Sequence, residues 1–191
     1  MNRREALSSV ALLLGGTIIG AEVFLSGCKA DEKKIGASLS FTPDDISFLD
    51  EVGETILPTT ASSPGAKETK IGEFMKTIVS DCYEEKDQKI FLDGMQKLDV
   101  ASKAKNGKSF LESDAKQRHD LLVDLDKEQK DYTGRKKPED PAHYFRMMKE
   151  LTLWGYFSSE AGATKALRYV AVPGKYEGCI PYKKGDKAWA T

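Results

Sequence analysis

Hydrophobic residues recur at helical spacing through most of the chain after residue 41. Thr42-Pro43-Asp44-Asp45 has the chemistry of a helix start: a capping hydroxyl, a proline that fits the first turn and two carboxylates for the positive helix end. The residues that follow lie on one helical face and end at Pro58, which stops the helix. That apolar face consists of Ile46, Leu49, Val52 and Ile56.

The middle of the chain predicts three more helices by the same spacing. The clearest apolar stripe consists of Ile71, Phe74, Met75, Ile78, Val79 and Cys82. A charged stretch at 84–89 can interrupt it, and the period resumes at Ile90, Phe91, Met95 and Leu98. Asn106-Gly107 predicts a turn. Ser113-Asp114 can open the next helix. One side of this helix consists of Arg118, Leu121, Leu122 and Leu125.

The last long helix is predicted from Ala142 to Phe157, opened by Asp140-Pro141 and dense in aromatic and methionine side chains. Met147 and Met148 are expected to pack in the core. Polar loops are predicted at 58–70 and 131–140, and no stretch alternates convincingly over six residues. The pattern therefore predicts an all-α fold, a single helical domain of about five helices.

The helical period disappears after Leu167. Residues 168–191 hold Pro and Gly turns together with four aromatic side chains: Tyr169, Tyr176, Tyr182 and Trp189. An irregular segment of this kind cannot form a core of its own. Its aromatic side chains either pack back on the helices or dock on another protein.

The N-terminal segment has the pattern of an export signal. Arg3 and Arg4 precede an uncharged apolar run that is shorter than the roughly 20 residues a membrane helix needs. The arginine pair resembles a twin-arginine signal, and Leu25-Ser26-Gly27-Cys28 resembles a bacterial lipobox in which Cys28 is acylated. We expect 1–27 to be a cleaved signal peptide, 28–40 a flexible tether and 41–191 the helical domain, lipid-anchored to a membrane in the periplasm.

The amino-acid composition argues against several classes of function. The 191 residues are 40% hydrophobic and 31% charged, which is typical of a soluble globular domain. With 29 basic and 30 acidic residues the net charge is -1, which argues against nucleic-acid binding. The chain has no Cys-x-x-Cys or Gly-x-Gly-x-x-Gly motif, and neither His119 nor His143 has a metal-binding partner at helical spacing. We expect no catalytic, cofactor or metal site in this chain.

The cysteines leave three arrangements open. If Cys28 carries a lipid, Cys82 and Cys179 remain in an oxidising compartment. They can form an internal disulfide that pins the tail, Cys179 can bridge to a partner chain, or both can stay free. In the last case, Cys82 is expected to be buried on its apolar stripe.

Three runs of sequence resemble the gluconate 2-dehydrogenase subunit 3 family. The first is Glu54–Pro58 followed by Ser63–Ala66, the second is Tyr144–Glu160 and the third is Tyr169–Cys179. The resemblance extends from Phe41 to Trp189. The lipobox is a departure, because many relatives have a simple cleaved signal, and it favours a complex that stays tethered.

The resemblance implies a non-catalytic small subunit of a periplasmic dehydrogenase complex that oxidises a sugar or a sugar acid. FAD and the substrate site would lie in a large flavoprotein partner of the glucose–methanol–choline type, and a cytochrome c subunit or another periplasmic acceptor would take the electrons. It also implies that this chain carries the unsignalled flavoprotein through the export channel. The alternatives are a structural periplasmic lipoprotein with no redox partner and a free-standing enzyme with an unrecognised site.

The surface that would bind the flavoprotein can also be predicted. In the tail the expected contacts are Tyr176, Cys179 and Trp189, because a coil cannot bury its own aromatic side chains. If the tail packs on its own helices, Trp154 and Tyr156 are the next candidates.

Overall fold

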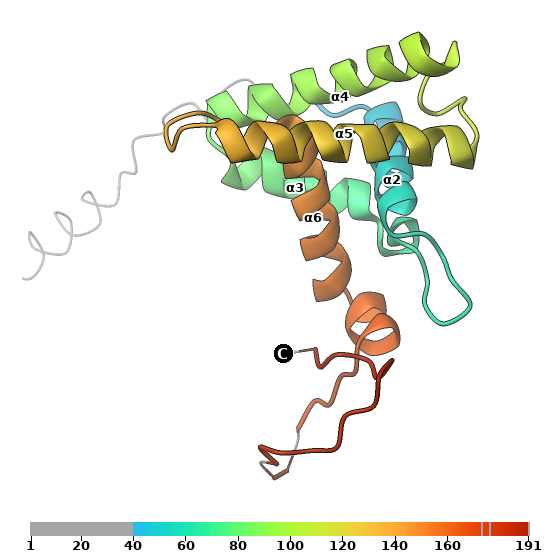
Figure 1. Cartoon of the computed structure of the whole chain (residues 1–191), viewed down its shortest axis with the longest axis vertical. Coiled ribbons are helices and arrows are strands. Elements are labelled where there is room, and N and C mark those ends of the chain that lie inside the picture. Colours follow the sequence, from blue (N-terminus) through green and yellow to red (C-terminus); the bar gives the residue numbers. More distant parts are fainter. Residues whose placement is uncertain (1–39, 173, 176, 191) are drawn as a thin grey trace, which may run out of the picture. The chain divides into compact units, whose positions relative to one another are not determined.

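The computed structural model describes residues 40–172, 174–175 and 177–190. This part of the chain is all-helical and contains five α-helices and two short helical turns (Figure 1). In chain order they are α2 (Pro43–Ile56), the 3-10 turn η1 (Ala66–Thr69), α3 (Ile71–Cys82), α4 (Glu85–Asn106), α5 (Ala115–Arg135), α6 (Tyr144–Ser158) and the π turn η2 (Gly162–Ala166). The predicted all-α class is confirmed for these residues. The predicted signal peptide lies outside the described residues, and the three domain boundaries stay predictions.

Helix starts follow the capping chemistry that the sequence predicts. At α2, Thr42 Oγ1 accepts from the Asp45 N–H at 3.2 Å while the Asp45 carboxylate accepts from the Thr42 N–H at 2.8 Å. Asp114 and Gln117 form the same reciprocal pair at the start of α5. Gly107 ends α4 at a positive φ of 71°, which glycine adopts without steric cost.

Two boundaries differ from the prediction, one through a contact with a residue beyond the helix and the other through a local cap. Helix α5 continues to Arg135, five residues into the predicted loop, where the Tyr132 hydroxyl donates to the Pro141 carbonyl at 3.0 Å. Helix α6 begins at Tyr144 rather than Ala142. His143 caps it, with Nδ1 accepting from the Phe145 N–H at 3.2 Å.

The predicted interruption between the second and third helices is confined to Tyr83 and Glu84. Gln88 fixes this corner, because its side-chain amide donates to the backbone carbonyls of Val79, Ser80 and Tyr83 at 3.1–3.2 Å. The orphan carbonyls at the end of α3 are thereby satisfied from the first turns of α4.

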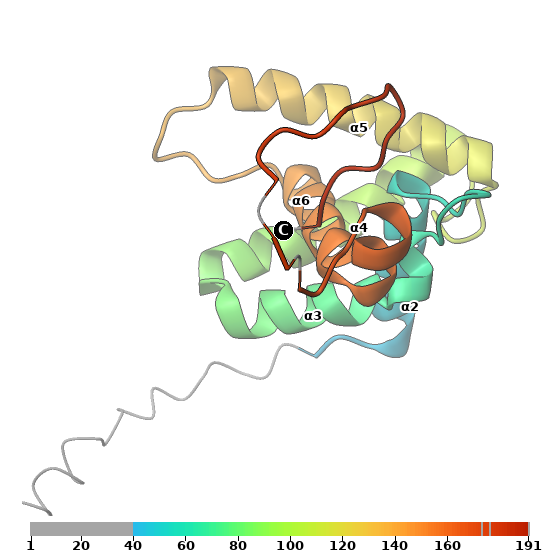
Figure 2. The ribbon, with the colours of Figure 1, turned by 90° about the horizontal axis from the view of Figure 1, so that it is seen from below.

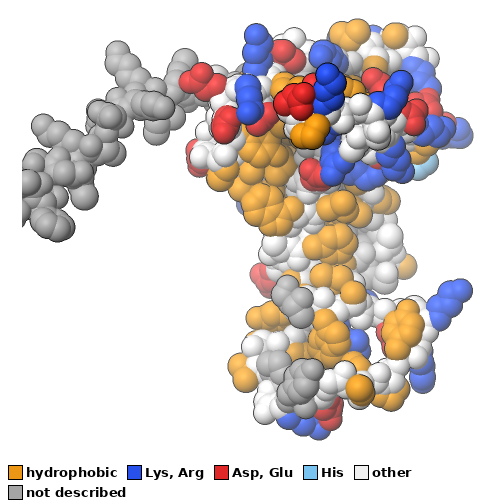
Figure 3. Space-filling model, turned by 60° about the vertical axis from the view of Figure 1, so that its left-hand side comes forward, with side chains coloured by type: hydrophobic (Ala, Val, Ile, Leu, Met, Phe, Trp, Pro, Cys, Tyr) orange, Lys and Arg blue, Asp and Glu red, His pale blue; other side chains and the backbone are white. Residues whose placement is uncertain are grey.

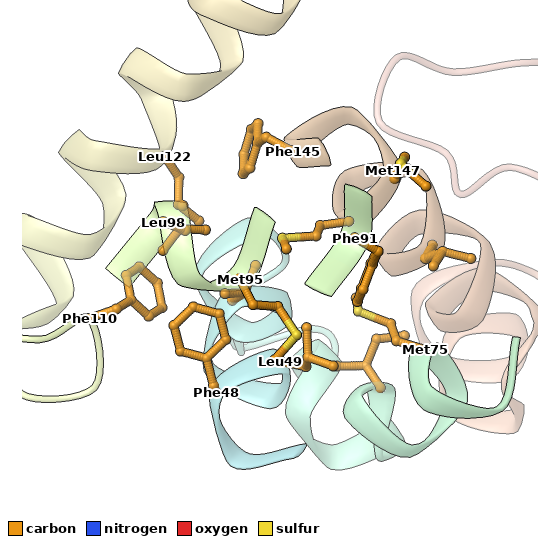
Figure 4. Close-up of a cluster of buried hydrophobic side chains, with 14 of the residues drawn as sticks. Phe48, Leu49, Met75, Phe91, Met95, Leu98, Phe110, Leu122, Phe145 and Met147 are labelled. Atoms are coloured by element: carbon orange, nitrogen blue, oxygen red, sulfur yellow. The ribbon is translucent and has the colours of Figure 1, made fainter. Parts of the chain in front are cut away.

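One core joins all five helices, and α6 contacts each of the other four. Figure 1 shows α4 and α5 side by side with α6 crossing them, and Figure 4 shows the cluster that fills the space between. Met147 and Met148 are buried, as predicted. The fully buried hydrophobic side chains include Leu49, Val52, Ile71, Met75, Val79, Phe91, Leu98, Phe110, Phe145 and Met148.

Two glycines allow α6 to pack closely against its neighbours. A Cβ on Gly94 of α4 would lie 2.4 Å from the Cβ of Tyr144. A Cβ on Gly155 would lie 2.5 Å from atoms of Ile71 and Phe74 on α3. Real Cβ atoms do not approach this closely, so these contacts fix the position of α6 across the bundle.

Asp126 of α5 ties α5 to α6. Its carboxylate accepts from Lys149 of α6 at 2.6 Å and pairs with Lys130 at 2.8 Å. Burial works in the opposite direction, but hydrogen bonds from Lys130, Lys149 and Gln129 lower the pKa of Asp126 from 3.8 to about 2. The carboxylate is therefore more stable in the folded chain than in the unfolded one.

This lowered pKa predicts an acid-sensitive contribution to stability. The folded pKa lies below the unfolded value, so the contribution is complete above about pH 4 and is lost between about pH 4 and pH 2. After allowance for partial exposure it amounts to roughly 1–2 kcal/mol. Denaturant titrations of Asp126→Asn should show that loss at pH 7 and a shallower decline below pH 4. The matched control is Asp93→Asn, an exposed carboxylate with no ion pair among the described residues. Equal acid sensitivity of Asp126→Asn and the unchanged chain would contradict the assignment.

Candidate partner interface

The C-terminal half of α6 presents apolar side chains to solvent. Trp154 is 56% exposed, and its ring lies edge-on against Phe74 with centroids 5.3 Å apart. Leu153 and Phe157 are exposed on the same helix. A contact residue must be accessible, and Trp154 meets that condition. Phe74 holds its ring in place.

Tyr156 is placed differently from its neighbour. Its side chain is only 3% exposed, and its hydroxyl donates to the Pro64 carbonyl at 2.6 Å. The residue ties the 57–65 loop to α6 from 92 positions away. Its own chain covers it, so Tyr156 has a structural role in this domain, and its contact with a partner stays a prediction.

Glu54 organises the same loop from the α2 side. Oε1 accepts from both the N–H and the hydroxyl of Thr59 at 2.9 Å, and Oε2 accepts from the Lys67 N–H at 3.0 Å. A Cβ on Gly65 would lie 2.1 Å from Oε2, so only glycine leaves room for the carboxylate. The Glu54–Pro58 and Ser63–Ala66 runs therefore form a loop anchor, a role that sequence reasoning did not assign.

A neighbouring carboxylate, Glu51, is neutralised in the same region. It bonds to Lys67 and to Arg118, whose Nε donates to the Ser113 carbonyl at 2.8 Å. Burial opposes ionisation, but the hydrogen bond from Lys67 and the charge of Arg118 hold the pKa of Glu51 below its ordinary value. The shallow pocket beside it is lined by Glu51, Glu54, Thr55, Pro58, Thr59, Ala115, Arg118 and His119. Both carboxylates in this pocket are engaged by their own chain, which is the arrangement of a structural ion cluster.

The histidines have ordinary positions. His119 is exposed on α5, and its ring nitrogen lies 3.5 Å from the Asp120 carboxylate. His143 caps α6 as described above. Across 40–172, 174–175 and 177–190, no three His, Cys, Asp or Glu side chains gather as a metal ion would require. None of the helices in that part of the chain has the length and apolar character needed to cross a membrane.

A rigid joint leads from α6 to the tail. The Ser159 hydroxyl donates to the Tyr156 carbonyl at 2.6 Å and accepts from the Gly162 N–H at 3.1 Å. A Cβ on Gly162 would lie 1.8 Å from the Tyr156 oxygen, so the π turn η2 requires glycine there. The joint directs the chain beyond the C-terminal end of α6, away from α4 and α5 (Figure 1), so that the tail lies in front of the helices in the view from below (Figure 2).

The tail returns to its own base instead of packing on the helices. Arg168 and Trp189 form an isolated bridge, with backbone hydrogen bonds of 2.8 Å from Arg168 to Ala188 and 2.9 Å from Ala190 to Arg168. The Arg168 guanidinium lies 4.0 Å from the centre of the Trp189 ring. Tyr169 and Tyr182 stay exposed, the latter at 75%. The sequence left two outcomes open for the tail aromatics, packing on the helices or docking on another protein. Among the described residues, the tail aromatics do not pack on the helices.

The remaining tail candidates divide between described and undescribed positions. Tyr176 lies outside the described residues, as do Arg3, Arg4 and Cys28. Cys179 is exposed with a free thiol. Trp189 is 45% exposed and contacts Arg168, so it closes the base of the tail.

Cys82 is a free and exposed thiol, so its predicted burial is wrong. It is the last residue of α3, and its side chain reaches solvent at that end of the apolar stripe. The structure contains no bond between Cys82 and Cys179. Helical periodicity identifies a face of a helix but cannot say how far along its length that face is covered.

Comparison with known proteins gives one result. The family model described as gluconate 2-dehydrogenase subunit 3 matches residues 43–174, from the first residue of α2 into the start of the tail. The match includes the Glu54 loop anchor, all of α6 and the η2 joint. No curated protein and no solved structure matches the chain.

Proposed function

Because the chain belongs to the gluconate 2-dehydrogenase subunit 3 family, we propose that it is the non-catalytic small subunit of an FAD-dependent dehydrogenase complex. The observation that carries the proposal is the family match over more than half of the chain. The partner would be a large flavoprotein of the glucose–methanol–choline type, which holds FAD and oxidises a sugar or a sugar acid. A cytochrome c subunit or another periplasmic acceptor would take the electrons.

The exposed side chains support a role in assembly. Trp154 on α6 and Tyr169 and Tyr182 in the tail are large aromatic groups left in solvent at one end of the helical domain. Aromatic side chains of this kind dominate the binding energy of protein interfaces. We place the flavoprotein on this end, which we call the aromatic end: the exposed face of α6 at 153–157 and the described residues of 168–190.

Export of the partner is the second part of the proposal. Arg3 and Arg4 would direct a folded complex through the twin-arginine route, and Cys28 would hold it on a membrane in the periplasm. These residues lie outside the described part of the chain, so this part of the proposal is supported by sequence alone.

The test replaces the arginine pair. Arg3→Lys with Arg4→Lys should leave both this chain and the flavoprotein in the cytoplasm, since the export machinery requires the guanidinium pair. Cell fractionation, immunoblotting and flavin-dependent dye reduction in the periplasmic and membrane fractions measure the outcome. Lys33→Arg with Lys34→Arg serves as a control for charge-conserving change near the N-terminus. Normal periplasmic amounts of the flavoprotein in the arginine variant would refute the carrier role.

Lipid attachment is tested separately. Cys28→Ala should abolish incorporation of a radiolabelled fatty acid and shift the chain from the membrane to the soluble fraction, because no thiol remains for the acyl group. Cys179→Ala, which removes an exposed thiol elsewhere, should leave labelling intact. Undiminished labelling of the Cys28 variant would show that the lipobox interpretation is wrong.

A further inference from the structure

The charges of the chain are unevenly distributed between the helices and the tail. Residues 168–191 carry five basic and two acidic side chains, a net charge of +3. Residues 28–167 carry 22 basic and 26 acidic side chains, a net charge of -4. A nearly neutral protein therefore ends in a distinctly basic segment.

The basic side chains of the tail are interleaved with exposed apolar ones. Lys183 and Lys184 follow Tyr182 directly, and Val172 and Ile180 are also exposed. Figure 3 shows hydrophobic and basic side chains next to one another over the tail. This mixture is typical of a surface that buries aromatic groups against a partner and uses charge for orientation.

The tail is also organised in the absence of a partner. Beyond the clasp between Arg168 and Trp189, Lys183 and Asp186 close a turn through hydrogen bonds of 2.9 and 3.0 Å. The Lys187 ammonium bonds to the Lys165 carbonyl of η2. The loop is therefore held at its base and at the Lys183–Asp186 turn, which reduces the entropy that binding must overcome.

The composition of the loop favours a protein partner. Exposed tyrosines beside lysines are typical of protein interfaces, in which aromatic groups supply binding energy and charges supply orientation. The loop follows η2, which contacts α6, so it lies at the aromatic end.

We propose that the described residues of the tail, 168–172, 174–175 and 177–190, belong to a preorganised basic docking loop that binds an acidic, partly apolar surface of the flavoprotein subunit. The inference rests on the proposed function and adds the chemistry of the partner surface. Tyr169, Tyr182, Lys183 and Lys184 contact the flavoprotein. Arg168 and Trp189 are positioning residues that keep the loop closed, so Trp189 acts through the clasp rather than as an anchor.

Zero-length cross-linking tests the contact directly. The full chain is tagged after Thr191 and purified from native membranes with its bound flavoprotein, and a carbodiimide then joins lysine amines to carboxylates in contact with them. The expected result is amide links from Lys183 or Lys184 to Asp or Glu of the flavoprotein, identified by mass spectrometry. Links only between two copies of this chain, or none from the loop, would overturn the proposal.

Charge reversal supplies the affinity measurement. Lys183→Glu with Lys184→Glu should weaken binding of the co-purified flavoprotein about tenfold or more at low salt, and the difference should shrink as salt rises. The matched control is Lys89→Glu with Lys97→Glu, two exposed lysines of α4. Equal binding by both variants would show that the loop charges are not used.

The contact between Arg168 and Trp189 can be tested by affinity and proteolysis measurements. Trp189→Ala should lower the affinity while leaving its salt dependence unchanged, and should speed proteolysis within the loop, whereas Trp189→Phe should restore both. Unchanged affinity of Trp189→Ala would refute the positioning role.

The proposed function and the loop inference can fail separately. Absence of any flavoprotein with the unmodified chain refutes both. A flavoprotein that binds equally well to all loop variants refutes the loop alone, as does binding of the loop lysines to anionic phospholipid vesicles in place of the flavoprotein.

Discussion

A chain that ends at Leu167 is expected to keep its helical fold and to lose the flavoprotein. The described tail side chains are mostly exposed, and the buried hydrophobic core ends with Tyr156, so little core packing is removed. Truncating an aromatic anchor costs roughly 2 kcal/mol or more, so loss of two anchors weakens binding by about a thousandfold. Circular dichroism melting and co-purification of flavin measure the two effects.

The control for this truncation is a substitution outside the aromatic end. Val100→Ala removes an exposed apolar side chain of α4 and should leave flavoprotein binding intact. A truncated domain that melts far below the full chain would show that the tail stabilises the helices, and the partner surface would then centre on Trp154. If Cys179 bridges to the partner, a heavier band on non-reducing gels will disappear in Cys179→Ser.

Glu54→Ala is expected to destabilise the domain by roughly 2–3 kcal/mol. The substitution leaves the Thr59 N–H, the Thr59 hydroxyl and the Lys67 N–H without the carboxylate that accepts from them. The loss should appear as a lower denaturant midpoint and as faster proteolysis in 57–65. The stability of Glu54→Gln should fall between those of the unchanged chain and Glu54→Ala, because the glutamine amide has only one acceptor oxygen.

The comparison for this prediction is Glu73→Ala on α3. Glu73 is exposed and its only close cation among the described residues is Lys76 at 3.7 Å, so its loss should change stability by a few tenths of a kcal/mol at most. A Glu54→Ala midpoint equal to that of Glu73→Ala would mean that the loop anchor contributes nothing.

Local chemistry explains why much of the fold could be predicted. Thr42 and Asp114 cap their helices through residues three positions away, and Gly107 ends α4 through its own backbone. Each of these signals is complete within one turn of helix, so sequence alone contains it. The extension of α5 to Arg135 was missed because Tyr132 is held by Pro141, which lies beyond the helix.

The interface could be predicted only in part, because its geometry depends on distant pairs. Trp154 and Tyr156 are two positions apart with similar composition around them, yet one is exposed and the other reaches Pro64. The clasp joins Arg168 to Trp189, and Glu54 meets Gly65 only after the loop has folded back. The sequence does show Glu54 followed by a Pro-Gly pair at 64–65. Only the three-dimensional structure shows that the carboxylate packs against that glycine.

The closed base of the tail decides where foreign sequence can be attached to this protein. Because Ala190 hydrogen-bonds to Arg168, the end of the described chain returns to a point two residues after η2 ends at Ala166. A reporter or affinity tag attached after Ala190 therefore starts beside Arg168, at the closed base of the loop. The same insertion at the Lys183–Asp186 turn would cover the lysines proposed to meet the flavoprotein, so the C-terminus is the better site for engineering.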